Sequence, residues 1–280
     1  MMDLQADLPV VYDSTRRGSL IFEELREILN YRYLILQLVR RDVLTRYKRS
    51  FLGVAWTMLN PLGMMLVWTI AFSQFFKSAD LPSYPAFVLN GLLAWTFFSQ
   101  TTTASMVNLV WGGGLLNRIY IPRTSFAIAA IGTGLVNIGL SMVPLMVVML
   151  VTGLPFHWSI LFTPISVLII AAFALGIGLL ISTWAVYFPD IAEMYQIVLT
   201  AWMFLTPVMY PETILPQAYR TYLTMLNPMY HMVKLFRIPI YYGRLPTLLE
   251  FLLPLGIALV VMVVGWAVFT KKSDEFAYRI

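Results

Sequence analysis

The sequence predicts an all-α integral membrane protein with six transmembrane helices. Of its 280 residues, 59% are hydrophobic and only 12% are charged, and the charges gather between long uncharged stretches. Soluble domains average about 45–50% apolar and about 25% charged residues, so both values point to a membrane protein. We expect three parts: a cytoplasmic segment over residues 1–50, a membrane domain over 51–270 and a cytoplasmic tail over 271–280.

The first helix is expected between about residues 20 and 47, at the inner membrane surface. Ile35, Val39 and Val43 form an apolar ladder with helical spacing, but four arginines interrupt any span. A charged residue at the bilayer centre costs about 2.5–3.5 kcal/mol, which favours an amphipathic helix at the interface. The amino-terminal stretch lacks the apolar core of a secretory signal, so we expect it to be retained in the cytoplasm.

The first span is predicted at residues 54–76, directly after a basic run. The stretch 40–61 reads RRDVLTRYKRSFLGVAWTMLNP, and no charged residue occurs between Ser50 and Lys77. Such a stretch is long enough to cross a hydrocarbon core about 30 Å thick. Because Lys and Arg beside a span hold that end inside, this junction also sets the direction of every later crossing.

The remaining spans are predicted at residues 86–110, 125–151, 159–186, 194–210 and 248–270. The second half of 86–110 is rich in hydroxyl and amide groups, including Thr101, Thr102, Ser105 and Asn108. These groups indicate either hydrogen bonds between helices, worth about 0.6 kcal/mol each, or one wall of a hydrated pathway. Glycines in the third and fourth spans are typical of close helix contacts, namely Gly132, Gly134, Gly139, Gly176 and Gly178.

Two connections are expected on the cytoplasmic side. Residues 111–123 (WGGGLLNRIYIPR) break the helix with three glycines and carry Arg118 and Arg123. In the turn at 187–193, Asp190 and Glu193 have the spacing of a helix N-cap with a capping box. A metal-binding pair is the alternative for these two carboxylates.

Residues 211–246 are apolar enough to enter a membrane but are not expected to cross it. Lys234, Arg237, Pro228 and Pro239 interrupt the segment. It fits one or two re-entrant helices, which are tolerated where protein or water covers the backbone.

Several kinds of chemistry have no motif in the sequence. There is no G-x-x-x-x-G-K-[ST] motif for ATP, no Cys, and the two His residues stand apart. Ionisable residues, which mark proton or ion coupling, are almost absent from the predicted spans. We therefore assign no catalytic, cofactor-binding or metal-binding residue and do not expect an enzyme. The net charge of +5 fits the positive-inside rule better than a nucleic-acid partner.

Aromatic residues make up 15% of the chain, and several lie in the middle of predicted spans. Packing and lipid contact are the simple explanation for each one. As a group, they also offer flat faces on which a sugar ring stacks, beside polar groups that bond its hydroxyls.

The basic junction at 40–61 resembles the same region of ABC-2 type permeases that export polysaccharides. The resemblance continues through YPAFVLNGLLAWTFF (84–98), NRIYIPR (117–123), TPVMYPETILP (206–216) and LNPMYHMVKLFR (226–237). It covers roughly residues 25–270 in the same order. Pro189 departs from the family, in which many members have an Arg before the Asp of this turn.

The resemblance implies a homodimer that works with two nucleotide-binding ATPase subunits, which hold ATP and Mg. It places coupling to the ATPase at Arg41, Asp42, Arg46, Leu115, Asn117, Arg118, Ile119, Tyr120, Pro122 and Arg123. Re-entrant helices between spans 5 and 6 imply an outer gate at Pro207, Tyr210, Asn227, Pro228 and Tyr230. Channel lining is expected from Trp56, Trp68, Phe72, Trp95, Thr96, Phe98, Ser99, Thr103 and Trp202.

The implied function is export of a lipid-linked polysaccharide, such as O-antigen, teichoic acid or capsule, across the bacterial cytoplasmic (inner) membrane. The chain would be a multi-pass protein with both termini in the cytoplasm, in contact with membrane lipid. One alternative within this architecture is an exporter of a drug or small lipid. A second is a membrane enzyme acting on a lipid-linked substrate, for which only Asp190 and Glu193 are candidates. A third is a purely structural membrane scaffold, which leaves the hydroxyl-rich half of the second span unexplained.

Overall fold

The computed structural model describes residues 28–47, 52–76, 81–110 and 122–278. Every regular element in these ranges is a helix, which confirms the all-α prediction. The α-helices are α2 (Arg32–Tyr47), α3 (Ala55–Phe72), α4 (Tyr84–Val110), α6 (Thr124–Val151), α7 (Thr163–Tyr187), α8 (Ile191–Leu205), α9 (Gln217–Leu226), α10 (Pro228–Ile240) and α11 (Leu248–Lys272). Short 3-10 helices are η2 (Trp158–Phe162), η3 (Glu212–Ile214) and η4 (Ser273–Tyr278).

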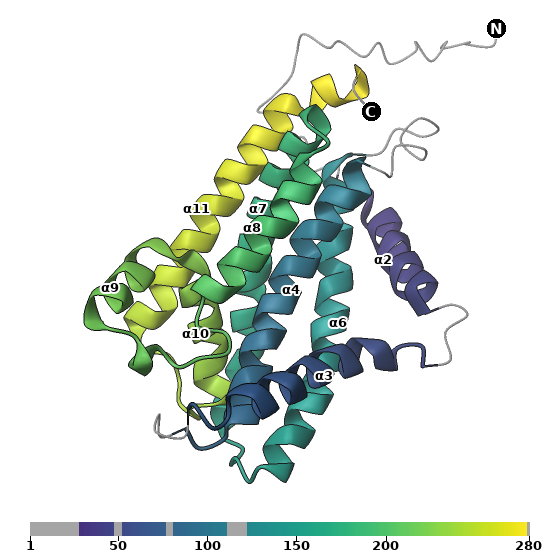
Figure 1. Cartoon of the computed structure of the whole chain (residues 1–280). Coiled ribbons are helices and arrows are strands. Elements are labelled where there is room, and N and C mark those ends of the chain that lie inside the picture. Colours follow the sequence, from purple (N-terminus) through teal and green to yellow (C-terminus); the bar gives the residue numbers. More distant parts are fainter. Residues whose placement is uncertain (1–27, 48–51, 77–80, 111–121, 279–280) are drawn as a thin grey trace, which may run out of the picture.

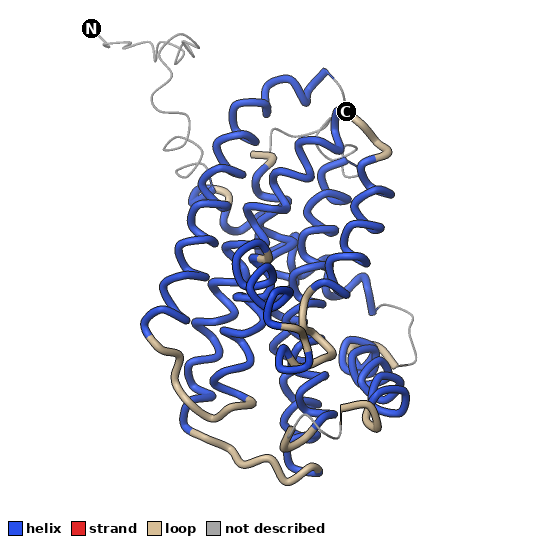
Figure 2. Tube along the Cα trace, turned by 60° about the vertical axis from the view of Figure 1, so that its left-hand side comes forward, coloured by secondary structure: helices blue, strands red, loops and turns tan. Residues whose placement is uncertain are grey.

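Four long helices, α4, α6, α7 and α11, run side by side and form the body of the molecule (Figure 1, Figure 2). Helix α4 packs against both α6 and α7, and α7 packs against α11. The centre of this bundle is filled by fully buried aromatic side chains, among them Phe87, Phe98 and Phe173. These apolar faces explain why the long spans associate within one chain.

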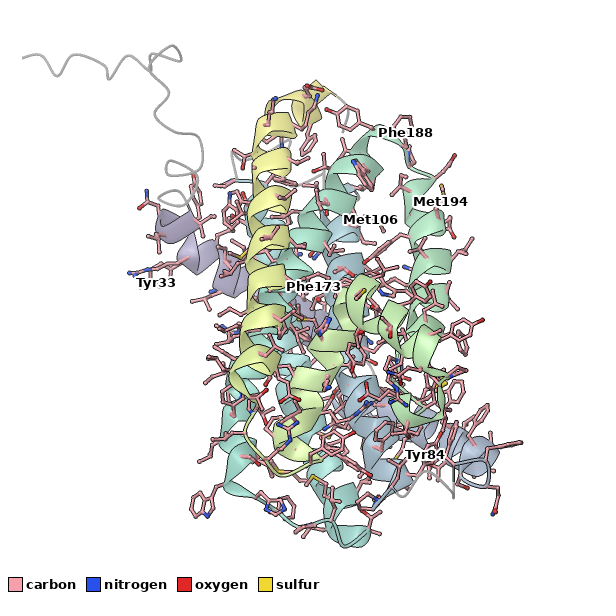
Figure 3. All side chains as sticks on the ribbon, turned by 90° about the vertical axis from the view of Figure 1, so that its left-hand side faces the viewer. Tyr33, Tyr84, Met106, Phe173, Phe188 and Met194 are labelled. Carbon is pink, nitrogen blue, oxygen red and sulfur yellow. The ribbon has the colours of Figure 1, made fainter. Side chains whose placement is uncertain are left out.

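The bundle has two ends, which Figure 3 marks with Phe188 and Tyr84. At the tail end, named for the carboxyl-terminal segment, the Arg123 guanidinium lies 5.6 Å from the centre of the Phe276 ring. At the far end, the Tyr84 hydroxyl donates to the Met209 carbonyl oxygen at 3.0 Å. The Tyr187 ring at the end of α7 lies edge-on to the same Phe276 ring, with centres 6.3 Å apart, so α6 and α7 both meet η4 at this end.

Close contact between α7 and α11 depends on two glycines. A Cβ atom at Gly265 would lie 2.2 Å from the Gly176 carbonyl oxygen, and one at Gly176 would lie 2.4 Å from that of Val261. The two backbones therefore touch directly. The predicted small-residue contact holds at Gly176 but not at Gly139, where a Cβ atom would meet nothing within 4 Å.

Four of the described helical stretches are long and apolar enough to cross a membrane. They are Ala55–Phe72, Thr124–Val151, Trp158–Tyr187 and Leu248–Lys272. Helix α4 has 27 residues, but its hydroxylated half makes it less apolar than these four. Helix α8 has 15 residues and falls below the usual lower limit of about 17. The count of six spans stays a prediction for α4 and α8.

Helix α3 does not follow the predicted course of a first span. It lies across the bundle rather than along it (Figure 1). Near its start, the Thr57 carbonyl oxygen accepts a hydrogen bond from Ser141, which lies in the middle of α6. Near its end, the Phe76 ring packs on Tyr84 at 5.4 Å. Only 11% of this stretch is buried, so contacts within one chain do not align α3 with the long helices of the bundle.

Helix α2 confirms a helix before the first span, and it packs on the first third of α6. Leu38 is 4% exposed and is buried with Phe126 and Ala129. Tyr33 and Leu36 are exposed and point away from the bundle, as Figure 3 shows for Tyr33. Apolar side chains therefore lie on two faces of α2, and its position at the membrane surface stays a prediction.

The capping box predicted at Asp190 is wrong. Asp190 stands at the N-cap of α8, but its side chain makes no capping hydrogen bond and its backbone is helical. The first free N–H groups, of Ile191 and Ala192, donate instead to the Phe188 and Pro189 carbonyl oxygens. Where the chain enters α11, Thr247 and Glu250 form a complete capping box, which the prediction missed.

Two short helices, α9 and α10, occupy the segment predicted to be re-entrant. None of the residues of α9 is buried, whereas ten of the thirteen residues of α10 are buried. Helix α10 packs against α4, α7 and α11, so its polar backbone is covered by protein. This placement fits a segment that enters the apolar body without running its full length.

Candidate functional site

A groove of about 900 Å³ runs between α3, α4, α6 and α8. Along α4 it extends from Leu93 to Asn108, which is about 22 Å at 1.5 Å per residue. Its polar lining consists of Thr57, Asn60, Thr96, Ser99, Gln100, Thr103, Asn108, Asn137, Ser141, Gln196 and Thr200. None of the described residues that line it carries a charge.

The hydroxyl-rich half of α4 divides its polar groups between two faces. Ser99 and Thr103 line the groove, and Gln196 of α8 donates from its side chain to the Thr103 hydroxyl at 3.3 Å. On the other face, Thr102 donates to a carbonyl of its own helix and accepts from the buried Tyr195 hydroxyl at 2.7 Å. Hydrogen bonds between helices therefore occur on both faces of α4, and the face with Ser99 and Thr103 also lines the groove.

The structure brings five of the nine predicted lining residues to this groove: Trp56, Trp95, Thr96, Ser99 and Thr103. Two others, Trp68 and Phe72, stack on each other in α3 with ring centres 5.2 Å apart, outside the groove.

Phe98 and Trp202 belong to an aromatic cluster behind the groove wall. Phe98 is fully buried and stacks on Phe173 with centres 5.4 Å apart. Trp202 stands edge-on to Phe98 at 5.4 Å and to Trp95 at 6.1 Å. Because Trp95 touches both the cluster and the groove, the cluster fixes the position of a lining indole.

Sequence reasoning missed three amides of the groove, Asn60, Asn137 and Gln196. Each interrupts an otherwise apolar helix, which is a usable signal because an amide rarely faces lipid alone. The signal identifies a polar position but not its partner. The bond between Gln196 and Thr103 joins residues 93 positions apart.

Asn227 joins the end of α8 to the start of α10. Its side-chain oxygen accepts from the Trp202 indole N–H at 2.8 Å and caps α10 by accepting from the Tyr230 N–H at 3.3 Å. Its amide nitrogen donates to the Thr206 hydroxyl at 3.0 Å. The predicted gate residues Pro207, Asn227, Pro228 and Tyr230 thus lie in one connected region, while the Tyr210 hydroxyl bonds the Phe204 carbonyl oxygen.

Arg237 is buried at the centre of this region. Its two terminal nitrogens donate to the Pro207 oxygen at 3.1 Å and the Val208 oxygen at 2.9 Å. Its guanidinium lies 3.8 Å from the centre of the Phe87 ring, where a cation is attracted to the aromatic face. A Cβ atom at Gly91 would lie 2.4 Å from the Val208 oxygen, so Gly91 leaves room for this arrangement.

Two other basic residues near this region, Arg244 and Lys234, lie beside carboxylates. Arg244 donates two hydrogen bonds to Glu250, at 2.7 and 2.8 Å. These bonds raise the pKa of Arg244. Lys234 lies 3.9 Å from both Glu212 and Glu250.

The predicted coupling residues are only partly described. Arg41 and Asp42 form an exposed ion pair at 2.9 Å. Pro122 and Arg123 lie at the tail end, at the start of α6. The side chain of Arg46 and the whole of Leu115, Asn117, Arg118, Ile119 and Tyr120 lie outside the described residues.

Several long apolar helices around a polar, uncharged groove define an integral membrane protein. Residues 33–241 match the family of ABC-2 type transporters. The chain is 30% identical to the O-antigen export system permease protein RfbA of Myxococcus xanthus, over 91% of this chain and 98% of that protein. It is 26% identical to the polysialic acid transport protein KpsM of Escherichia coli, over 84% and 91% of the two chains. The chain belongs to the ABC-2 type transporter family.

Proposed function

We propose that this chain is the permease subunit of an exporter that moves a lipid-linked polysaccharide across the cytoplasmic membrane. The observation that carries the proposal is similarity, over 76–91% of the chain, to proteins named for O-antigen export, polysialic acid transport and capsule polysaccharide export. The groove supports it, because hydroxyl and amide groups beside the exposed Trp56 indole suit a neutral sugar chain.

The energy for transport comes, in this proposal, from ATP hydrolysis in two separate nucleotide-binding subunits that hold ATP and Mg. The chain has no phosphate-binding loop of its own. The tail end faces the cytoplasm, where the loop at 111–123 and α2 contact the ATPase. The far end faces outward, with α9 and α10 as re-entrant helices at the gate.

Two copies of the chain form the channel in this proposal, each contributing six spans. Within a single chain, the groove is lined by α3, α4, α6 and α8 and is not a closed cavity. The stretches Ala55–Phe72 and Leu248–Lys272 are only 11% and 17% buried, so large apolar faces are available to lipid and to a second copy. A symmetric partner would close two half-grooves into one path.

Reconstitution of the chain alone in liposomes tests whether ATP hydrolysis depends on a separate subunit. We expect no ATP hydrolysis above the level of empty liposomes, and hydrolysis that appears when the partner ATPase is added. Appreciable ATPase activity of the purified chain by itself would refute the proposal.

A further inference from the structure

A second cavity, of about 270 Å³, lies at the far end of the bundle. It is separate from the polar groove and shares no lining residue with it. The cavity lies between the start of α4, the segment after α8, the inner face of α10 and the loop before α11. Its walls are Phe87, Pro207, Glu212, Tyr230, Val233, Lys234, Arg237, Tyr242 and Arg244.

Arg237 lines this cavity and has one hydrogen-bond donor without an acceptor in the described part of the chain. The residue is 5% exposed, and both of its terminal nitrogens bind backbone oxygens. Its Nε atom is buried and has no partner among the described residues. Buried donors of charged groups are seldom left unsatisfied, because their lost hydration is not replaced. An acceptor in the cavity would supply the missing hydrogen-bond partner of the guanidinium.

The charges around the cavity leave an excess of one positive charge. Arg244 and Glu250 neutralise each other through two short hydrogen bonds. Of the remaining groups, Lys234 and Arg237 are cations and Glu212 is the single carboxylate. One oxygen of Glu212 already accepts from the Tyr230 hydroxyl, and Lys234 Nζ lies 3.9 Å from oxygens of both Glu212 and Glu250, beyond hydrogen-bond distance. An oxyanion would therefore be attracted between Lys234 and Arg237.

We propose that this cavity binds the phosphate group of a membrane lipid, with Arg237 Nε and Lys234 Nζ as donors. The loop before α11 borders it, α11 is long and apolar enough to cross a membrane, and the ends of such helices lie at the depth of the headgroups. Basic pockets between such helices bind lipid headgroups through charge-assisted hydrogen bonds. A bound lipid phosphate would fix the depth of α10 in one leaflet of the membrane. This effect does not depend on the substrate that the groove carries.

The test measures thermal unfolding of the full chain in detergent with added phosphatidylglycerol. We expect the lipid to raise the unfolding temperature by roughly 5 °C near saturation. The Lys234→Gln variant should lose at least half of this shift. The matched control is Lys271→Gln, which removes the same charge from an exposed position at the opposite end of α11 and should keep the full shift.

Two further ligands identify the source of the anion. An uncharged glycolipid with the same acyl chains and no phosphate should give little shift. The proposed site would be overturned if the glycolipid raised the unfolding temperature of the parent chain as much as phosphatidylglycerol does. It would also be overturned if phosphatidylglycerol raised the unfolding temperature of Lys234→Gln as much as that of the parent chain. Inorganic phosphate alone should also give little shift. If it reproduces the effect of the lipid, the cavity binds free phosphate and the lipid assignment is wrong.

Discussion

Arg237 shows how a single charged residue can be tolerated inside an apolar body. Its positive charge is stabilised by hydrogen bonds to two backbone oxygens and by a cation–π contact with the Phe87 ring. The sequence indicates only that a charge in this segment opposes a clean crossing. The acceptors, Pro207 and Val208, lie about thirty positions away in a turn between helices, so local pattern could not identify them.

Gly91 is predicted to be essential for the same arrangement. In Gly91→Ala, the new Cβ atom would lie 2.5 Å from the Arg237 Nη2 atom and 2.4 Å from the Val208 oxygen. Overpacking of this kind costs about 1–3 kcal/mol, so the unfolding temperature of the purified chain should fall by several degrees.

The control for this prediction is Gly256→Ala in α11, where a Cβ atom would meet nothing within 4 Å. Alanine is favoured over glycine inside a helix, so this variant should be as stable as the parent chain or more stable. Equal stability of the two variants would show that the contact at Gly91 is not tight.

At the scale of elements, most helices could be predicted from the positions of charges, glycines and prolines. The third span was predicted at 125–151 and the helix is Thr124–Val151. The fifth span was predicted to reach residue 210, but α8 ends at Leu205 because Asn227 and Arg237 hold the following segment in a turn. Those contacts come from distant parts of the chain and leave no local signal.

The groove face of α4 is predicted to contribute directly to transport. A triple variant with Thr96→Val, Ser99→Ala and Thr103→Val removes three hydroxyls that line the groove while keeping the side chains similar in size. Each hydrogen-bonding group contributes about 0.5–1.5 kcal/mol, and about 1.4 kcal/mol is a tenfold change in rate. Export by the assembled complex should fall at least about tenfold, the result if each hydroxyl contributes about 0.5 kcal/mol.

A matched change outside the groove is Thr152→Val, which removes a hydroxyl that bonds a carbonyl of its own helix. Its export rate should stay within twofold of the parent rate, a change of less than about 0.5 kcal/mol in the barrier. If the triple variant transports as fast as this control, the groove is not the path.

The loop before α6 is predicted to couple ATP hydrolysis to transport. Reversing its charge with Arg118→Glu and Arg123→Glu should abolish export while the partner still hydrolyses ATP and the chain stays folded. Like charges placed at an interface reduce complementarity with the partner. Lys271→Glu, at the same end of the bundle, is the control. Unchanged export in the double variant would exclude a coupling role.

At the scale of the whole molecule, the sequence could predict the class of protein but not the shape of its path. Low charge and long apolar stretches are sufficient for a membrane protein. The groove, however, depends on which face of α4 turns toward α8, and the α4 hydroxyls occur on both faces. The direction of α3 relative to the bundle could not be predicted from the sequence either, because most of its apolar surface contacts no other part of the same chain.

The central claim is that this chain provides the path for a lipid-linked polysaccharide. It is tested most directly in inside-out proteoliposomes that contain the chain with its partner ATPase. The measurement is the fraction of added lipid-linked polysaccharide that becomes protected from an external glycosidase. We predict that this fraction rises with ATP, and that it does not rise without the chain or with a non-hydrolysable nucleotide. Protection that never depends on ATP, or movement of a glycan-free lipid in place of the polysaccharide, would contradict the proposed function.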